Sequence, residues 1–106
     1  MATPVAPQQG ETQAARDVLA ERRRQVEAEG WTTEHDDEHD CGELASAAGC
    51  YAMYTQAYPA GDPHQSWPWD ASWWKPKTAR ENLVRAGALI LAEIERLDRN
   101  LTPPEA

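Results

Sequence analysis

The chain has 106 residues and a formal net charge of −8, from 18 acidic residues against 10 Lys and Arg. A chain of this length forms one domain with a modest core, so association between copies is a natural way to bury more apolar surface. The negative charge argues against direct binding to nucleic acid or to an anionic membrane. The longest apolar run, 86–92, is far shorter than the roughly 20 residues that a membrane span requires.

The domain organisation follows from composition along the chain. Residues 1–10 contain two prolines and no basic run followed by an apolar stretch, so we expect a flexible tail there, no secretory signal, and a cytoplasmic protein. Residues 11–100 are expected to form a single all-α domain. A second flexible tail is expected over 101–106, which contains two further prolines.

The first predicted helix runs from about Thr12 to Glu29 and ends at Gly30, with apolar residues at helical spacing. Three consecutive arginines, Arg22 to Arg24, cannot share one face of a helix. We therefore expect Arg22 to lie along the edge of the core and the other two to pair with acids.

A second helix is predicted from about residue 34 to about Tyr58, because Thr33 and Asp36 resemble a capping box. Its expected buried stripe comprises Cys41, Leu44, Ala45, Ala48, Tyr51 and Ala52. On one helix, Cys41 and Cys50 would lie roughly 13 Å apart, too far for a disulfide. Both are expected to be reduced, buried thiols.

A long loop is predicted over residues 59–77, which hold four of the eight prolines and four of the five tryptophans. Such a segment cannot be a regular helix. Its length favours a functional role over a mere connection, and its aromatic content argues against disorder.

Thr78 and Glu81 form a capping box that predicts a third helix to about Arg99. Its expected buried stripe comprises Leu83, Ala86, Gly87, Ile90, Ile94 and Leu97, and it is widened by Val84, Leu89 and Leu91. Three adjacent apolar residues, 89–91, cannot all face one small core, so this helix is the expected subunit interface. The predicted architecture is an all-α, three-helix domain that assembles into an oligomeric bundle, a homo-oligomer.

A divalent-metal site is predicted within residues 34–43. His35, His39 and Glu43 are spaced i, i+4, i+8, which stacks them along one helical face, and a histidine pair at i, i+4 is suited to zinc. Asp36 and Asp40 form an oxygen-only pair suited to magnesium or manganese. The alternative is an acidic helix start that complements the helix dipole while the histidines stay in water.

A second ligand site is predicted where the Trp-rich loop meets the third helix. Flat rings for stacking, positive charges and the free amides of a helix start together suit a nucleotide-type small molecule. The residues expected to contribute are Trp73, Trp74, Lys75, Lys77, Thr78 and Arg80. The alternative is that the tryptophans close the open end of the core and the lysines stay in water.

Segments 18–25, 30–31, 34–37 and 86–99 together resemble a widespread group of small phage and prophage proteins, and the resemblance covers about Val18 to Arg99. More distantly, the pattern is similar to MazG-like all-α nucleoside triphosphate pyrophosphohydrolases. Segments 21–25 and 80–83 match the "ER-x-RQ" and "RExL" helices of that family. The resemblance implies a magnesium site on the central helix, where Glu43 is kept but Ser46 occupies the position of a second acid. No Asp is evident near Asn82 and Arg85, where the family has its fourth ligand.

The sequence leaves three functions open. The first is a phage-type helical protein that binds a nucleotide or a nucleotide-derived signal without turning it over, with a sequestering, anti-defence role. The second is a metal-dependent nucleotide pyrophosphohydrolase that uses Glu43, Asp36, Asp40 and Glu81. The third is an acidic inhibitor that binds a host protein.

Overall fold

The computed structural model describes residues 11–101, and this part of the chain contains helices and no strand. The two predicted tails, 1–10 and 102–106, lie outside the described residues. The elements are α1 (Gln13–Glu29), α2 (Thr33–Asp37), α3 (Glu43–Met53), the 3₁₀ turn η2 (Ala71–Trp73) and α4 (Ala79–Leu101). The prediction of an all-α fold is confirmed for the described residues.

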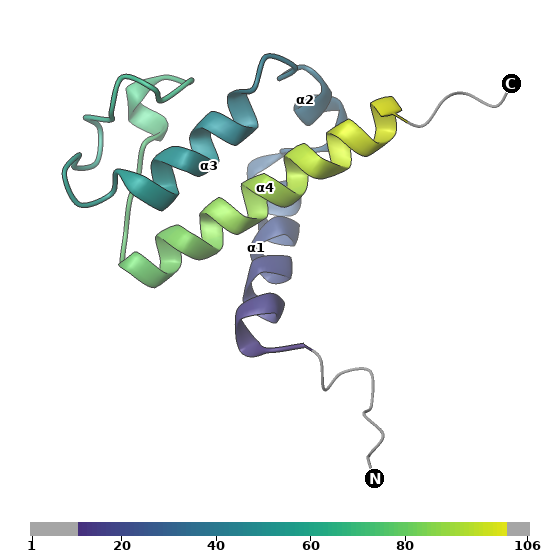
Figure 1. The fold of residues 1–106 in the computed structure, drawn as a ribbon, viewed down its shortest axis with the longest axis horizontal. Coiled ribbons are helices and arrows are strands. Elements are labelled where there is room, and N and C mark those ends of the chain that lie inside the picture. The colour runs from purple at the N-terminus through teal and green to yellow at the C-terminus, as the bar shows by residue number, and fades with distance from the viewer. Residues whose placement is uncertain (1–10, 102–106) are drawn as a thin grey trace, which may run out of the picture.

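The longest helix, α4, organises the molecule (Figure 1). α3 lies alongside it, α1 crosses it, and α2 contacts it near its C-terminal end. The crossing with α1 is close because Gly87 has no side chain: a Cβ atom there would lie 3.2 Å from a methyl carbon of Val18.

The bounds of α1 and the start of α4 agree with the capping signals. Thr12 caps α1 by accepting a hydrogen bond from the Ala15 amide, and Gly30 ends the helix with a φ of 73°. Thr78 and Glu81 make the reciprocal hydrogen bonds of a capping box at the start of α4. The first and last predicted helices are therefore confirmed.

The prediction of one continuous helix over 34–58 is wrong. Thr32, not Thr33, caps the short helix α2, and the chain then leaves the helical path until Gly42. Gly42 has a φ of 86°, in the left-handed region that favours glycine, and α3 begins directly after it. Because α3 also ends at Met53, Cys41 lies outside any helix and is exposed, while Cys50 is buried.

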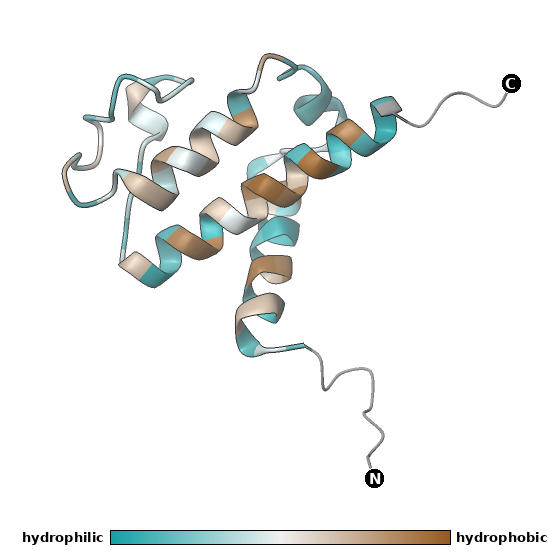
Figure 2. Cartoon of the chain, in the orientation of Figure 1, coloured by the Kyte–Doolittle hydropathy of each residue, from teal (hydrophilic) through white to brown (hydrophobic). Residues whose placement is uncertain are grey.

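The buried faces of the helices differ from the predicted stripes. α3 buries Leu44, Ala47, Ala48, Cys50 and Tyr51, whereas Ala45 and Ala52 are exposed. The buried residues of α4 overlap the predicted set only at Ala86 and Leu89, and they comprise Asn82, Ala86, Ala88, Leu89, Ala92 and Arg96. The four large residues of the predicted stripe are exposed instead: Leu83 57%, Ile90 47%, Ile94 47% and Leu97 40%. Hydrophobic residues accordingly colour the outer face of α4 in Figure 2.

The Trp-rich loop closes the core. Trp74 is fully buried and its Nε1 donates a hydrogen bond of 2.8 Å to the Tyr58 carbonyl, and Trp67 is buried with its Nε1 donating to the Asp70 carbonyl. Both indoles pack on the ring of Tyr51. The alternative stated for the tryptophans, that they close the open end of the core, thus holds for Trp74.

Within the described part of the chain, no helix combines the length and the apolar character needed to cross a membrane.

Candidate functional site

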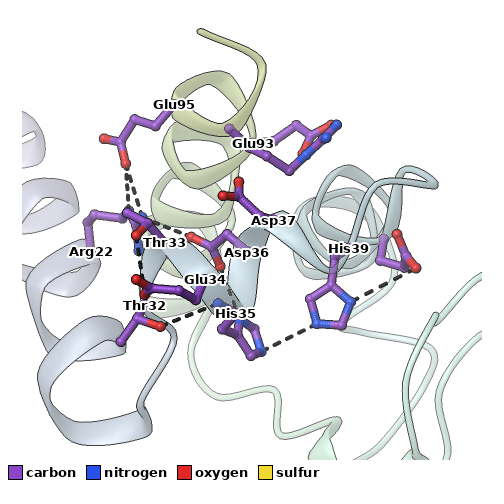
Figure 3. A network of polar contacts seen from close by, with 12 residues as sticks. Arg22, Thr32, Thr33, Glu34, His35, Asp36, Asp37, His39, Glu93 and Glu95 are labelled. Atoms are coloured by element: carbon purple, nitrogen blue, oxygen red, sulfur yellow. Dashed lines mark hydrogen bonds and ion pairs between the residues drawn. The ribbon is translucent and has the colours of Figure 1, made fainter. Parts of the chain in front are cut away.

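A chain of polar contacts runs from α4 through α1 and α2 to the start of α3 (Figure 3). The Nδ1 atom of His35 lies 3.1 Å from Oδ1 of Asp36, and the Nε2 atoms of His35 and His39 are 3.3 Å apart. Nδ1 of His39 faces Oε2 of Glu43 at 3.9 Å. The two imidazoles therefore converge on each other, with a carboxylate behind each ring.

Asp36 is fixed from inside the protein. Its side chain is fully buried, and its Oδ2 accepts a hydrogen bond of 3.0 Å from Arg22, which also binds Glu95 on α4. The expectation that Arg22 lies at the edge of the core is confirmed. Of its neighbours, Arg24 pairs with Glu21 and Glu29, whereas Arg23 makes no ion pair among the described residues.

An aromatic pocket of about 310 Å³ adjoins the histidine pair. Its lining consists of Trp31, His35, His39, Trp69, Asp70 and Trp73. Trp31 stacks on His35 with their planes 2° apart, and Trp69 lies 5.4 Å from His39. Trp73 is half exposed, so one of its faces is available to a ligand.

A charged groove of about 610 Å³ lies between α1, α4 and the segment that precedes α4. Its charged lining comprises Asp17, Glu21, Arg24, Glu29, Lys75, Lys77, Arg80, Glu81 and Arg85. Most of these groups are paired within the groove, as Arg80 is with Asp17 at 2.8 Å. Lys75 and Lys77, the two lysines of the chain, make no ion pair among the described residues, and Lys75 lies 5.6 Å from the ring centre of Trp73.

Glu21 sits at the bottom of this groove as a carboxylate. Burial by itself would raise the pKa of Glu21, but hydrogen bonds from Arg24 and Gln25 and the positive charges of Arg24 and Arg85 hold that pKa below its ordinary value. The same contacts raise the pKa of Arg24. Glu21 and Arg24 therefore both favour their charged forms.

A narrow pocket lies between the aromatic pocket and the charged groove and shares lining residues with both. It shares Trp31, Trp69 and Trp73 with the first, and Arg24, Glu29, Lys75 and Arg85 with the second. Two buried polar atoms in its lining, Nε1 of Trp69 and Oε1 of Gln25, have no hydrogen-bond partner within the protein. Unpaired buried donors and acceptors are costly, so a donor and an acceptor of this kind beside a pocket favour a site for a polar ligand.

The predicted anion-binding residues are only partly brought together. Trp73, Lys75, Lys77 and Arg80 line the connected pockets. Trp74 is excluded as a stacking surface because it has no exposed area. Thr78 is engaged by Glu81, whose carboxylate accepts hydrogen bonds from the Thr78 amide and hydroxyl. A carboxylate thus already occupies part of the α4 start, and the predicted phosphate position shifts towards the lysines.

The predicted metal ligands, too, are only partly brought together. His35 and His39 remain adjacent although α2 ends at Asp37, and Glu43 stays near His39. The expected Asp36 and Asp40 pair is not formed, because Asp36 points to Arg22 and Asp40 lies in the turn after α2. Within residues 11–101, no three His, Cys, Asp or Glu side chains converge as a metal-binding group.

Sequence reasoning missed Trp31, Trp69, Asp70, Gln25 and Arg85 as lining residues. Trp31 and Gln25 belong to the first helix and its end, whereas Trp69 and Asp70 lie in the loop, so only the tertiary fold brings them together. Arg85 could have been predicted from its spacing, because it lies one helical turn after the capping box. The structure adds that it faces Glu21. The chain matches no protein-family model, no curated protein and no solved structure.

Proposed function

We propose that the protein binds a nucleotide or a nucleotide-derived signal molecule and does not hydrolyse it. The observation that carries this proposal is the proximity of the aromatic pocket and the charged groove: Trp73 of the former and Lys75 of the latter both line the narrow pocket between them. A small molecule that carries a flat ring and an anionic group could bind the aromatic pocket with its ring and the charged groove with its anionic group.

The ring of the ligand would lie in the aromatic pocket. Stacking of a base on an aromatic side chain contributes about 1–3 kcal/mol. Trp73 offers an exposed face for it, and Trp31 and Trp69 form the walls. Trp69 also lines this pocket, and its Nε1 is a buried donor with no hydrogen-bond partner among the described residues, so a rotation of this indole would let it donate to the polar edge of the ring.

The phosphates of the ligand would lie near Lys75 and Lys77. Neither ammonium group makes an ion pair within 4.0 Å among the described residues, although the charge of Lys77 helps to lower the pKa of Glu81, so binding a phosphate breaks no close ion pair there. Arg80 and Arg85 lie on the same groove but are shared with Asp17 and Glu21. The lysines are therefore the main anion-binding groups, and the arginines contribute less.

The positions of the acids support binding without turnover. Asp36 is held by Arg22, Glu43 begins α3, and Glu81 caps α4. Magnesium is held mainly by carboxylate oxygens gathered around one point, and these acids are distributed over three separate places. Capture of a signalling nucleotide would be a sequestering, anti-defence activity suited to a protein of phage type.

A panel of nucleotides, linear and cyclic, titrated with and without magnesium tests the proposal. We expect saturable binding by calorimetry and unchanged ligand by mass spectrometry. Trp73→Ala should weaken binding at every salt concentration, because stacking is not screened. Lys77→Ala should weaken it most at low salt, where charge is least screened. Arg23→Ala is the matched control, because it removes an exposed positive charge outside the pockets.

The other two functions are distinct outcomes of the same titration. Magnesium-dependent product formation would replace the proposal with a MazG-like pyrophosphohydrolase. If no nucleotide at millimolar concentration changes tryptophan fluorescence or the melting temperature, the proposal is wrong and an acidic inhibitor of a host protein takes its place.

A further inference from the structure

We propose that His35 and His39 bind one divalent transition-metal ion through their Nε2 atoms at the edge of the aromatic pocket. This site goes beyond nucleotide binding and requires no nucleotide. It also differs from the set of ligands expected from the sequence, because Asp36 supports a ligand and is not one itself.

The separation of the two nitrogens fits a shared ion. Zinc binds imidazole nitrogen at about 2.0–2.1 Å, so two nitrogens on one tetrahedral ion lie about 3.4 Å apart. The Nε2 atoms of His35 and His39 are 3.3 Å apart. The ion would need no rearrangement of either ring beyond a small rotation.

A carboxylate behind His35 favours the tautomer that a metal requires. Metal-binding histidines donate their second ring N–H to a carboxylate or carbonyl, which orients the ring and raises its basicity. Asp36 lies 3.1 Å from Nδ1 of His35, within hydrogen-bond distance, and is itself held by Arg22 at 3.0 Å. Glu43 faces Nδ1 of His39 at 3.9 Å, which is too long for a hydrogen bond, so it would have to move closer to hold His39 in the same way.

When no metal is bound, a hydrogen lies between the Nε2 atoms of His35 and His39. Two Nε2 lone pairs at 3.3 Å repel each other, so one of the two nitrogens carries a hydrogen that it donates to the other. For a metal ion to take both lone pairs, this hydrogen must move to the Nδ1 atom of the same ring, a change of tautomer that leaves both imidazoles neutral. Acid opposes binding because it protonates the imidazoles, as at any site that requires neutral imidazole.

The remaining coordination positions face the aromatic pocket, where Asp70 also contributes to the lining. Because the described residues supply two nitrogens and no third converging ligand, water or a small ligand completes the coordination. Nitrogen ligands select zinc, copper or nickel over magnesium.

Copper titration followed by tryptophan fluorescence tests the site directly, with zinc and magnesium titrations by calorimetry beside it. Trp31 stacks 5.7 Å from His35 and Trp69 lies 5.4 Å from His39, so a bound copper ion quenches them. We expect saturable 1:1 quenching by copper, competition by zinc, and no heat with magnesium. His35→Ala and His39→Ala should each abolish saturable quenching while the helical circular dichroism is retained, since both side chains are partly exposed.

Two matched variants separate this site from other donors. His64→Ala removes the third histidine, which stacks on Tyr54 away from the pair, and should leave quenching unchanged. Cys41→Ser should also bind copper normally, because a hydrogen bond to Asp40 raises the pKa of the exposed Cys41 thiol. Equal quenching of wild type and His39→Ala, or loss of quenching in Cys41→Ser, would overturn the proposal.

Discussion

Arg22 and Asp36 connect the core to the candidate site. The Asp36 carboxylate accepts from Arg22 on one oxygen and lies against His35 on the other, and its side chain is 1% exposed. Neither residue type predicts this burial, since charged groups are seldom fully buried unless paired. The sequence could place Arg22 at the edge of the core from helical spacing, but it could not show that Asp36 would be the partner.

Breaking this ion pair should be strongly destabilising. Asp36→Ala leaves the Arg22 guanidinium with only the half-exposed Glu95 as partner, and loss of one member of a buried pair costs about 3–5 kcal/mol. Urea unfolding measures the change. Asp62→Ala, at an exposed aspartate in the loop, should alter the free energy of unfolding by less than about 0.5 kcal/mol. Similar small losses in both variants would contradict the buried ion pair.

Glu21 should make the stability depend on pH in the acid range. Its pKa is lower in the folded chain than the ordinary value of 4.5, so its stabilising contribution is complete above that value and is lost as the pH falls through the folded pKa. Glu21→Gln should lower stability at neutral pH and flatten this acid loss. Denaturant unfolding at a series of pH values from about 6 to about 3 measures both. A variant that loses stability with acid as steeply as the wild type would show that Glu21 contributes nothing to the dependence.

Among the elements, helices with strong end signals were predictable and the middle of the chain was not. Thr12, Gly30 and the Thr78 and Glu81 capping box mark their ends through local contacts that a sequence displays. The break at Gly42 has no comparable signal, because glycine also occurs inside helices, as Gly49 does in α3. Apolar periodicity likewise misplaced most of the buried face of α4, since Leu89, three alanines and paired polar groups face the core while Leu83, Ile90, Ile94 and Leu97 do not.

Two glycine substitutions should have opposite effects if the chain breaks between α2 and α3. Gly42→Ala forces an L-residue into the left-handed region at a φ of 86° and should destabilise by about 1–2 kcal/mol. Gly49→Ala, inside α3 with no atom within 4 Å of the added carbon, should stabilise by about 0.5–1 kcal/mol. Thermal unfolding of the two variants checks this. Stabilisation by both would instead support one continuous helix.

At the scale of the whole molecule, α4 leaves four large apolar side chains between 40% and 57% exposed. Leu83, Ile90, Ile94 and Leu97 recur at spacings of three, four or seven residues, which is the pattern of paired helices. The homo-oligomer expected from the sequence therefore stays a proposal, with this face of α4 against its counterpart in a second copy. Ile90, between the buried Leu89 and the partly buried Leu91, is its central exposed residue.

Ile90→Asp should lower the assembly state in sedimentation at micromolar concentration. A charge in the centre of an apolar contact is desolvated without a partner, which opposes association. Met53→Asp is the control, because Met53 is 67% exposed at the end of α3, away from this face. A wild-type protein that sediments as a monomer would contradict the proposed interface.

The candidate site could be predicted in part from the sequence. The lysines and Trp73 were recognisable because they occur together in sequence, next to a helix start. The second wall of the aromatic pocket comes from Trp31, which precedes Trp73 by more than 40 residues. No local sequence pattern indicates that Trp31 lies against Trp69. The proposed site therefore depends on the tertiary fold as well as on the loop.

The indole N–H signals of the five tryptophans, recorded in a ¹⁵N-correlated NMR spectrum during nucleotide titration, test the proposed binding mode most directly. We expect the signals of Trp31, Trp69 and Trp73 to move, because these rings line the aromatic pocket. Those of Trp67 and Trp74 should stay, since each indole donates to a backbone carbonyl inside the core. Saturable shifts confined to the first three would support the nucleotide site. No shift at millimolar nucleotide, or equal shifts of all five, would contradict it.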